Sequence, residues 1–298
     1  MCGIVGLFLK DDRLAPQLGG MLSEMLVTMT DRGPDSAGIA LYGASRGSSF
    51  KVTVQSDDPA NGFNGLAAHL SSATGKPCSI EEKSTHAVIS TDSSNAGKLV
   101  AQLRDAHNEL RIMATGESME IYKEVGLPKD VAARFNINQM NGTHGIGHTR
   151  MATESAITTM GAHPFSTGAD QCLVHNGSLS NHNSLRRSLR RNGVHIETEN
   201  DSEVAAAYLT HRMNQGRNLG EALEDSLDDL DGFFTFVVGT KNGFGVLRDP
   251  IACKPAVMAE TDRYVAFGSE YRALVSLPSI DTARVWEPEP ANVYFWER

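Results

Sequence analysis

The sequence predicts an α+β fold in which two layers of antiparallel strands are flanked by helices. Short β-prone runs recur along the chain and alternate with segments whose apolar residues have helical spacing. An Asn-Gly turn signal at Asn242–Gly243 joins two of these runs as a hairpin. The 298 residues, of which 40% are hydrophobic, are enough for one large domain or two small ones. These observations indicate a globular protein with a sizeable core.

The N-terminal elements are the most regular. Ile4–Phe8 is a short β-prone run, and Gly3 before it permits a close backbone approach or a turn. Pro16–Thr30 carries leucine and methionine at helical spacing, which is typical of a helix packed on the core. A turn cluster over residues 30–36 ends this helix and precedes a strand at Gly38–Leu41.

Residues 45–141 are expected to form a small α+β insertion between two halves of the main sheet, and its role stays open. The insertion contains no phosphate loop and no dinucleotide fingerprint. Its expected elements are strands at Phe50–Val54, His86–Thr91 and Met119–Val125, and helices at Phe63–Ser71, Ala96–Asn108 and Lys129–Arg134.

The C-terminal half begins with a glycine-lined strand at 145–153. A second strand over 172–177 ends in Asn176–Gly177, which is a turn signal. Asn200–Glu203 resembles a capping box before a helix at Val204–Met213. The other expected elements are helices from Ser180 or Asn181 to Gly193, at Leu219–Leu230 and at Glu270–Leu277, and strands at Phe233–Gly239, Phe244–Arg248, around Val257, at Tyr264–Gly268 and near Asn292–Trp296.

Composition and charge exclude several functional classes. The net charge of −9 argues against nucleic acid or an anionic membrane as the main partner. The chain has no basic N-terminal segment and no apolar stretch near about 18 residues, so we expect a cytoplasmic protein. Cys2, Cys78, Cys172 and Cys253 are far apart and are typical of reduced thiols. Five of the ten histidines lie between His144 and His182, but without metal-ligand spacing, so we expect no metal site.

Cys2 is the candidate nucleophile. Removal of Met1 would leave one residue with both a thiol and a free α-amine, which pairs a nucleophile with its own general base. The alternative is that Cys2 is an ordinary small residue at the start of an edge strand.

Four other residues or pairs are candidates for a site, and three of them have an ordinary structural alternative. Asn176 and the backbone N–H of Gly177 offer two donors for an oxyanion hole, but they also fit a simple turn. Asp201 in a first helical turn stabilises the helix dipole by roughly 0.3–1 kcal/mol whether or not it binds a ligand. Arg32 is able to brace a neighbouring loop, or to be a solvated arginine in a surface turn. Arg150 is the one arginine of the glycine-lined strand.

Six segments of this sequence, in this order, resemble the glutaminase domain of the class II, N-terminal-cysteine glutamine amidotransferases. They are MCGIVG, DRGPDSAG, GIGHTRMAT, AHPF, VHNGSLSNH and ENDSEV. The resemblance covers Met1–Leu41 and about Gly145–Leu277. It implies a four-layer αββα sandwich of the N-terminal-nucleophile hydrolase type over residues 2–298, with 45–141 inserted, and hydrolysis of L-glutamine to glutamate and ammonia.

The resemblance also implies roles for individual residues. Cys2 would attack the side-chain amide and form a thioester, while its α-amine takes and returns protons. Asn176 and the Gly177 amide would hold the oxyanion. Arg150 would clamp the α-carboxylate of glutamine, and Asp201 would receive its α-ammonium group. The remaining family positions are Thr153 and His163, which would line the pocket, and Arg32, which would brace the loop over the cysteine.

Departures from the family pattern bear on the subtype. Met151 stands where the glucosamine-6-phosphate synthase branch has Trp, and Asp31 precedes Arg32 where His is common. Arg248-Asp249-Pro250 resembles the purine-pathway amidotransferases, but we expect no phosphoribosyl-binding domain after it. The whole chain resembles the stand-alone amidotransferase subunit of glutamate-synthase-like complexes such as N-methylglutamate synthase. We therefore expect a hetero-oligomer in which a separate synthase subunit receives the ammonia. No cofactor is expected in this chain, and any FMN or iron–sulfur cluster would belong to the partner.

Two other functions stay open at the level of sequence. One is an N-terminal-nucleophile hydrolase of another amide, which would share Cys2 and the oxyanion hole but would not need both Arg150 and Asp201. The other is an inactive regulatory subunit with the same fold.

Overall fold

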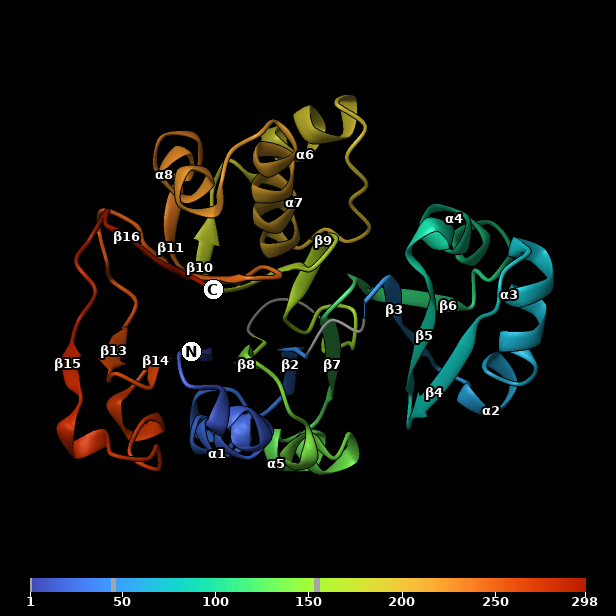
Figure 1. Ribbon diagram of the computed structural model, residues 1–298. Helices are drawn as coiled ribbons and strands as arrows, with labels where there is room; N and C mark the ends of the chain where they lie inside the picture. The colour runs from blue at the N-terminus through green and yellow to red at the C-terminus, as the bar shows by residue number, and fades with distance from the viewer. Residues whose placement is uncertain (1, 44–46, 153–155) are drawn as a thin grey trace.

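The protein consists of a two-sheet body and a smaller module at one side (Figure 1). The computed structural model describes residues 2–43, 47–152 and 156–298. One body sheet has seven strands in the order β15-β13-β14-β1-β8-β2-β7, and the other has five in the order β16-β12-β11-β10-β9. The seven strands are β1 (Gly3–Leu9), β2 (Ser36–Tyr42), β7 (Met119–Val125), β8 (His144–Arg150), β13 (Val257–Glu260), β14 (Tyr264–Gly268) and β15 (Arg284–Trp286). The five are β9 (Phe165–Gly168), β10 (Gln171–Leu179), β11 (Gly232–Gly239), β12 (Gly243–Arg248) and β16 (Val293–Glu297).

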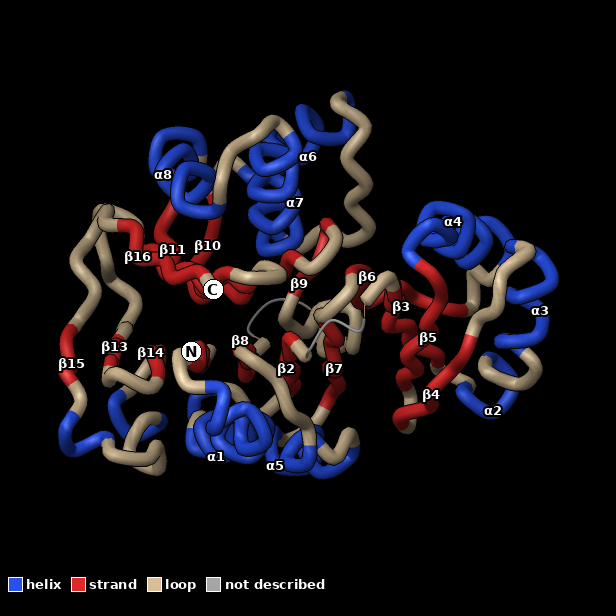
Figure 2. Tube along the Cα trace, in the orientation of Figure 1, coloured by secondary structure: helices blue, strands red, loops and turns tan. Residues whose placement is uncertain are grey.

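Helices cover the outer face of each body sheet (Figure 2). Helices α1 (Leu18–Thr28) and α5 (Pro128–Arg134) lie on the seven-stranded sheet. Helices α6 (His182–Arg191), α7 (Asp201–Asn214) and α8 (Leu219–Asp229) lie on the five-stranded sheet. The predicted four-layer αββα sandwich with antiparallel strands is therefore confirmed.

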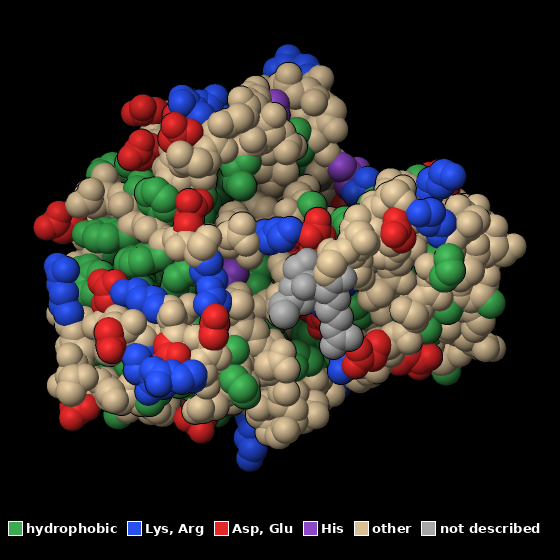
Figure 3. Space-filling view, in the orientation of Figure 1, with side chains coloured by type: hydrophobic (Ala, Val, Ile, Leu, Met, Phe, Trp, Pro, Cys, Tyr) green, Lys and Arg blue, Asp and Glu red, His purple; other side chains and the backbone are tan. Residues whose placement is uncertain are grey.

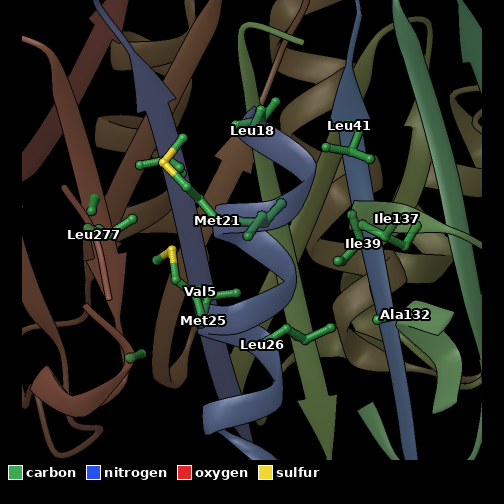
Figure 4. Packing of buried hydrophobic residues seen from close by; sticks show 14 of the residues in the cluster. Val5, Leu18, Met21, Met25, Leu26, Ile39, Leu41, Ala132, Ile137 and Leu277 are labelled. Atoms are coloured by element: carbon green, nitrogen blue, oxygen red, sulfur yellow. The ribbon is translucent and has the colours of Figure 1, made fainter. Parts of the chain in front are cut away.

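Strand β1 is buried along its whole length because both of its faces are covered. Val5, Leu7 and Leu9 pack in one cluster with the leucines and methionines of α1, while Ile4 and Phe8 belong to the cluster between the two sheets. This alternation follows from the two-residue period of a strand. Figure 4 shows Met21, Met25 and Leu26 of α1 over Val5 and the neighbouring strands. The predicted core role of the α1 stripe is confirmed.

The module has its own antiparallel sheet, in the order β4-β5-β3-β6. Its elements are β3 (Ser49–Ser56), α2 (Pro59–Gly62), α3 (Leu66–Thr74), β4 (Ser79–Lys83), β5 (His86–Asp92), α4 (Ala96–Ala106) and β6 (Leu110–Gly116). This βαββαβ succession with its strand order is the ferredoxin-like arrangement. Residues of β3, β5, α3 and α4 form a separate hydrophobic cluster. β7 and α5, although within the predicted insertion 45–141, belong to the body.

Three predicted local features are wrong. β10 continues through Asn176 and Gly177, because these residues pair with Thr235 and Phe234 of β11, and this pairing overrides the local turn signal. The predicted helix at Glu270–Leu277 is a short 3₁₀ turn, Tyr271–Ala273, followed by i→i+3 hydrogen bonds from the N–H groups of Leu274 and Leu277.

The third is the capping box. The Asn200 side chain does cap α7, but the Glu203 carboxylate accepts bonds from the backbone of Glu197 and Thr198 instead of Asn200. A full capping box occurs at Asn218 and Glu221, at the start of α8. The sequence analysis did not predict four of the strands: β4, β6, β9 and β15. The 3₁₀ helices are η1 (Asp12–Gln17), η2 (Thr30–Arg32), η3 (Ser93–Asn95), η4 (Ile137–Gln139), η5 (Tyr271–Ala273) and η6 (Ile280–Thr282).

Candidate active site

A cleft of about 740 Å³ opens at one end of the two body sheets. Its walls come from the residue before β1, the end of β8, the end of β10 and the start of α7. Among the predicted site residues it is lined by Cys2, Arg150, His163, Asn176, Gly177 and Asp201. The fold thus brings together side chains that are up to 199 residues apart in the sequence.

Cys2 is held through its backbone at the edge of this cleft. Its carbonyl oxygen accepts hydrogen bonds from Nε of Arg32 at 3.0 Å and from Nδ2 of Asn176 at 3.2 Å. Arg32 is buried and is itself fixed, because Nη1 donates to Oε1 of Glu270 at 2.6 Å. This bond, with a further contribution from Arg272, holds the pKa of Glu270 below its usual value. Arg32 therefore holds the backbone of Cys2 in place from outside the cleft and does not line the cleft.

Asn176 and Gly177 lie near the end of β10, beside Cys2. Asn176 is buried, and its amide already contacts the residue that carries the thiol. Gly177 has φ of +155°, and an added Cβ would lie 2.0 Å from the Phe233 carbonyl oxygen. Only glycine fits this position, because any side chain would clash with the neighbouring strand.

Arg150 and Asp201 supply opposite charges to the same cleft. Arg150 ends β8 and is 8% exposed, with Nη1 at 3.4 Å from the Ala156 carbonyl oxygen. Asp201 is the first residue of α7, and its Oδ2 accepts from the Leu179 backbone N–H at 2.9 Å. A cation and an anion that face one cavity are suited to a zwitterionic ligand such as a free amino acid.

Beneath these groups lies a buried network that the sequence analysis did not foresee. Ser202 Oγ lies 2.8 Å from Nε2 of His163 and 2.9 Å from Nδ1 of His175. His148 stacks on His163 with ring centroids 4.0 Å apart. Nε2 of His148 lies 3.1 Å from the His175 carbonyl oxygen and must be the donor, since a carbonyl only accepts.

The three rings of this network are neutral at pH 7. Burial lowers the pKa of His148 to about 3, and it lowers the pKa of His163 well below the ordinary value. Burial also lowers the pKa of His175, although the nearby Asp201 carboxylate opposes this shift. One hint was present in the sequence: Ser202 follows Asp201 and His175 precedes Asn176, so each adjoins a predicted site residue.

Thr153 and the end of the strand predicted over 145–153 lie outside the residues that the structure describes. Across the described ranges, no group of three or more His, Cys, Asp or Glu side chains is placed to hold a metal ion. In the same part of the chain, no helix combines the length and apolar character needed to cross a membrane.

Comparisons with known proteins agree with this geometry. A family model described as a glutamine amidotransferase domain matches residues 148–276. "Glutamine amidotransferase-like protein GlxB" of Rhizobium meliloti (strain 1021) is 67% identical over 297 residues, covering 100% of this chain and 98% of that protein. A "Putative glutamine amidotransferase" of Methanothermobacter thermautotrophicus is 33% identical, and the alignment covers all of both chains.

Solved structures give the fold. Glutamine phosphoribosylpyrophosphate amidotransferase from B. subtilis superposes with a TM-score of 0.62 at 19% identity, covering 99% of this chain and 47% of that one. A structure described as the allosteric regulatory enzyme of purine biosynthesis gives a TM-score of 0.64 with the same coverage. This chain thus spans about half the length of those structures. Two glutamine amidotransferase relatives align over the full length of this chain, and the solved structures share its fold. The chain therefore belongs to the class II glutamine amidotransferases, enzymes that hydrolyse the side-chain amide of glutamine.

Proposed function

We propose that this chain is a glutaminase subunit that uses Cys2 to hydrolyse L-glutamine and passes the ammonia to a separate synthase subunit. The observation that carries the proposal is that Cys2, Asn176, Gly177, Arg150 and Asp201 line one cleft. Residues 2–298 would form one glutaminase domain, and the module over 49–116 would be carried within it.

Catalysis begins at the N-terminus once Met1 is removed. The Cys2 thiol attacks the amide carbon of glutamine, and the α-amine of Cys2 takes the thiol proton. Collapse of the tetrahedral intermediate breaks the C–N bond, and the α-amine returns the proton to the leaving ammonia. Water, deprotonated by the same amine, then attacks the thioester and releases glutamate and the free thiol.

The oxyanion of each tetrahedral intermediate is held by Asn176 Nδ2 and the Gly177 backbone N–H. Nδ2 of Asn176 donates to the Cys2 carbonyl oxygen at 3.2 Å, which keeps the amide beside the nucleophile. A single preorganised donor of this kind lowers the barrier by roughly 2.7–4 kcal/mol. The close fit of Gly177 against Phe233 holds the second donor in place.

Specificity for a free amino acid comes from the two charges of the cleft. Arg150 binds the α-carboxylate of glutamine, and Asp201 binds the α-ammonium group. His163 lines the pocket around the side chain of glutamine, and it is oriented by its bond with Ser202. Arg32 keeps the Cys2 backbone in position.

A separate synthase subunit is supported by the lengths of the relatives. The chain covers 98% and 100% of the two amidotransferase-like relatives but only 47% of the phosphoribosylpyrophosphate amidotransferase chain. We propose a synthase of the glutamate-synthase-like kind, such as N-methylglutamate synthase, in which the partner holds the FMN and iron–sulfur clusters. Co-purification of the native complex, with absorbance spectra of the partner, tests this part.

Glutamine turnover by wild type, Cys2→Ala and Arg150→Ala tests the chemistry, after intact-mass measurement has confirmed the loss of Met1. Cys2→Ala should abolish glutamine hydrolysis without changing ammonia-dependent synthesis in the assembled complex. Arg150→Ala should raise KM for glutamine steeply, since it removes the carboxylate clamp. Intact glutamine hydrolysis in Arg150→Ala would refute the proposed substrate binding. Equal loss of glutamine-dependent and ammonia-dependent synthesis in Cys2→Ala would refute the ammonia-donor role.

A further inference from the structure

The segment 156–161 forms one wall of the catalytic cleft and contacts Arg150. Its lining residues are Ala156, Thr158, Met160 and Gly161. Nη1 of Arg150 lies 3.4 Å from the Ala156 carbonyl oxygen, and a Cβ added at Gly161 would lie 3.1 Å from the same nitrogen. The position of this segment therefore decides how much room a ligand has beside the Arg150 guanidinium.

Strand β7 holds this part of the chain through two adjacent side chains. Nζ of Lys123 donates to the carbonyl oxygens of Ala162 at 2.8 Å and Pro164 at 3.2 Å. Oε1 of Glu124 accepts a hydrogen bond from the hydroxyl of Thr159. β7 is an edge strand of the seven-stranded sheet, and adjacent side chains of a strand point to opposite faces. Glu124 thus fixes residue 159 within the cleft wall, while Lys123 fixes the residues that follow it.

Glu124 also binds the module. Its Oε2 accepts from the hydroxyl of Thr85, at 2.9 Å, in the turn between β4 and β5. Glu124 is 7% exposed; it also accepts from the Val125 N–H at 3.0 Å and lies 3.5 Å from Nη1 of Arg134 in α5. A buried carboxylate is costly without donors, and these donors come from the module, from the body and from the cleft wall. The module packs against the body, with charged side chains along the junction (Figure 3).

We propose that Glu124 is a positioning residue for glutamine binding and that it couples the module to the glutamine cleft. Thr85 binds one carboxylate oxygen and Thr159 binds the other, so the position of the cleft wall depends on where the β4–β5 turn lies. A change in the module that moves this turn therefore changes KM for glutamine. Glu124 is not among the residues that line the cleft, so it acts through Thr159. The effect on KM rests on the proposed glutaminase function, whereas the link between module and cleft wall does not.

Steady-state kinetics with glutamine test the coupling in Thr85→Val, which removes the hydroxyl and keeps the shape of the side chain. KM should rise about three- to tenfold with little change in kcat, because the wall of the cleft is altered and the nucleophile is not. Thr85→Ser, which keeps the hydroxyl, should retain the wild-type KM. The matched control is Thr91→Val in β5, whose hydroxyl donates to the Pro77 carbonyl oxygen within the module, and it should leave KM unchanged.

A double-mutant cycle places the link at Glu124. Thr159→Val should raise KM by a similar factor, and the double variant with Thr85→Val should be no worse than Thr159→Val alone, because both changes break the same link. In Glu124→Leu, which offers no acceptor, Thr85→Val should likewise have no further effect. Additive effects of the two threonine changes on the free energy of glutamine binding would overturn the proposal.

Hydrogen exchange of the ligand-free protein measures the link without any need for activity. The N–H groups of Gly161 and Ala162 donate to Thr158 Oγ1 and to the Thr159 carbonyl oxygen, so their protection reports on the order of the cleft wall. Thr85→Val should lower this protection, and Thr91→Val should not. Unchanged protection or an unchanged KM in Thr85→Val would overturn the proposal. Protection that depends on Thr85 in a protein without glutaminase activity would support the link and refute the proposed function instead.

Discussion

The body and the module are built from similar lengths of strand and helix but place their polar residues differently. In the module, apolar residues such as Val52, Val54 and Leu99 form a small core, while β4 is mostly exposed. In the body, charged and polar side chains such as Arg150, Asn176 and Ser202 are buried at one end of the sheets. Buried polar groups cost free energy unless they are paired, so their concentration marks the end of the body that carries the chemistry.

The largest predicted effect is acid instability of the body. Burial lowers the pKa of His144 and His148 to about 4 and 3, and His163 and His175 are lowered as well. Their folded pKa values lie below the unfolded value of 6.5, so the stability they confer is complete above pH 6.5 and is lost as pH falls toward 3. His144 and His148 each cost about 1.4 kcal/mol per pH unit between pH 6.5 and their folded pKa values.

Urea unfolding of the body at pH 7, 6 and 5 measures this loss. His148→Gln should reduce the pH dependence, whereas His69→Gln, at an exposed position of the module, should leave it unchanged. His86 of β5 also has a pKa lowered to about 3, and its ring packs against Phe135 of the body, so it should follow the body. A free energy of unfolding that does not change between pH 7 and 5 would contradict the prediction.

A paired cavity experiment asks whether the module and the body unfold separately. Leu99→Ala in the module and Leu209→Ala in the body each remove a fully buried side chain. Each should cost about 2–5 kcal/mol of local stability. Hydrogen exchange should then rise within 49–116 for Leu99→Ala, with glutamine turnover kept, and across the body for Leu209→Ala. The same loss of protection everywhere in both variants would mean that the two parts unfold as one unit.

Asn176→Ala tests the chemistry at the end of the body. Removal of one oxyanion donor should lower kcat by about 10²–10³-fold with little change in KM, since the donor acts mainly in the transition state. Asn181→Ala is the matched control, because this half-buried asparagine donates to the Asp229 carbonyl oxygen and does not line the cleft. An unchanged kcat in Asn176→Ala would remove Asn176 from the oxyanion hole.

The smallest predicted effect comes from Ser202→Ala. Loss of the hydroxyl leaves Nε2 of His163 and Nδ1 of His175 without their shared partner, which should cost about 1–2 kcal/mol and appear mainly in KM for glutamine. Ser226 is equally buried, but its hydroxyl bonds to Leu223 within its own helix, so Ser226→Ala should leave KM unchanged. If the two variants behave alike, Ser202 does not position the glutamine pocket.

Local patterns predicted most of the regular elements. Strand β1 and helix α1 lie where apolar spacing indicated, because both keep one period over their whole length. The short strands β9 and β15 escaped prediction, since each is defined by its partner rather than by its own few residues. Asn176–Gly177 was wrongly predicted as a turn because its pairing with β11 is not visible in the local sequence.

Prediction of the candidate site from the sequence has a similar limit. Motif order correctly predicted the family, and the fold gathers Cys2, Arg150, Asn176 and Asp201 in one cleft, although their catalytic roles stay predictions. The link from His163 through Ser202 to His175 spans three separate elements, so no spacing within the sequence reveals it. Lys123 looked like an ordinary residue of a strand, and only the packing of β7 against the segment around His163 shows that it is buried.

The chain leaves the body after Tyr42 and returns at Met119, and these two residues are directly paired neighbours on β2 and β7. A hydrogen bond from Gly43 N to the Ser118 carbonyl oxygen joins the two crossing points at 3.0 Å. The module is thus inserted in the connection between the two paired strands β2 and β7. Replacing residues 44–116 by a short hairpin turn should therefore leave the pairing of β2 with β7 intact and give a minimal amidotransferase.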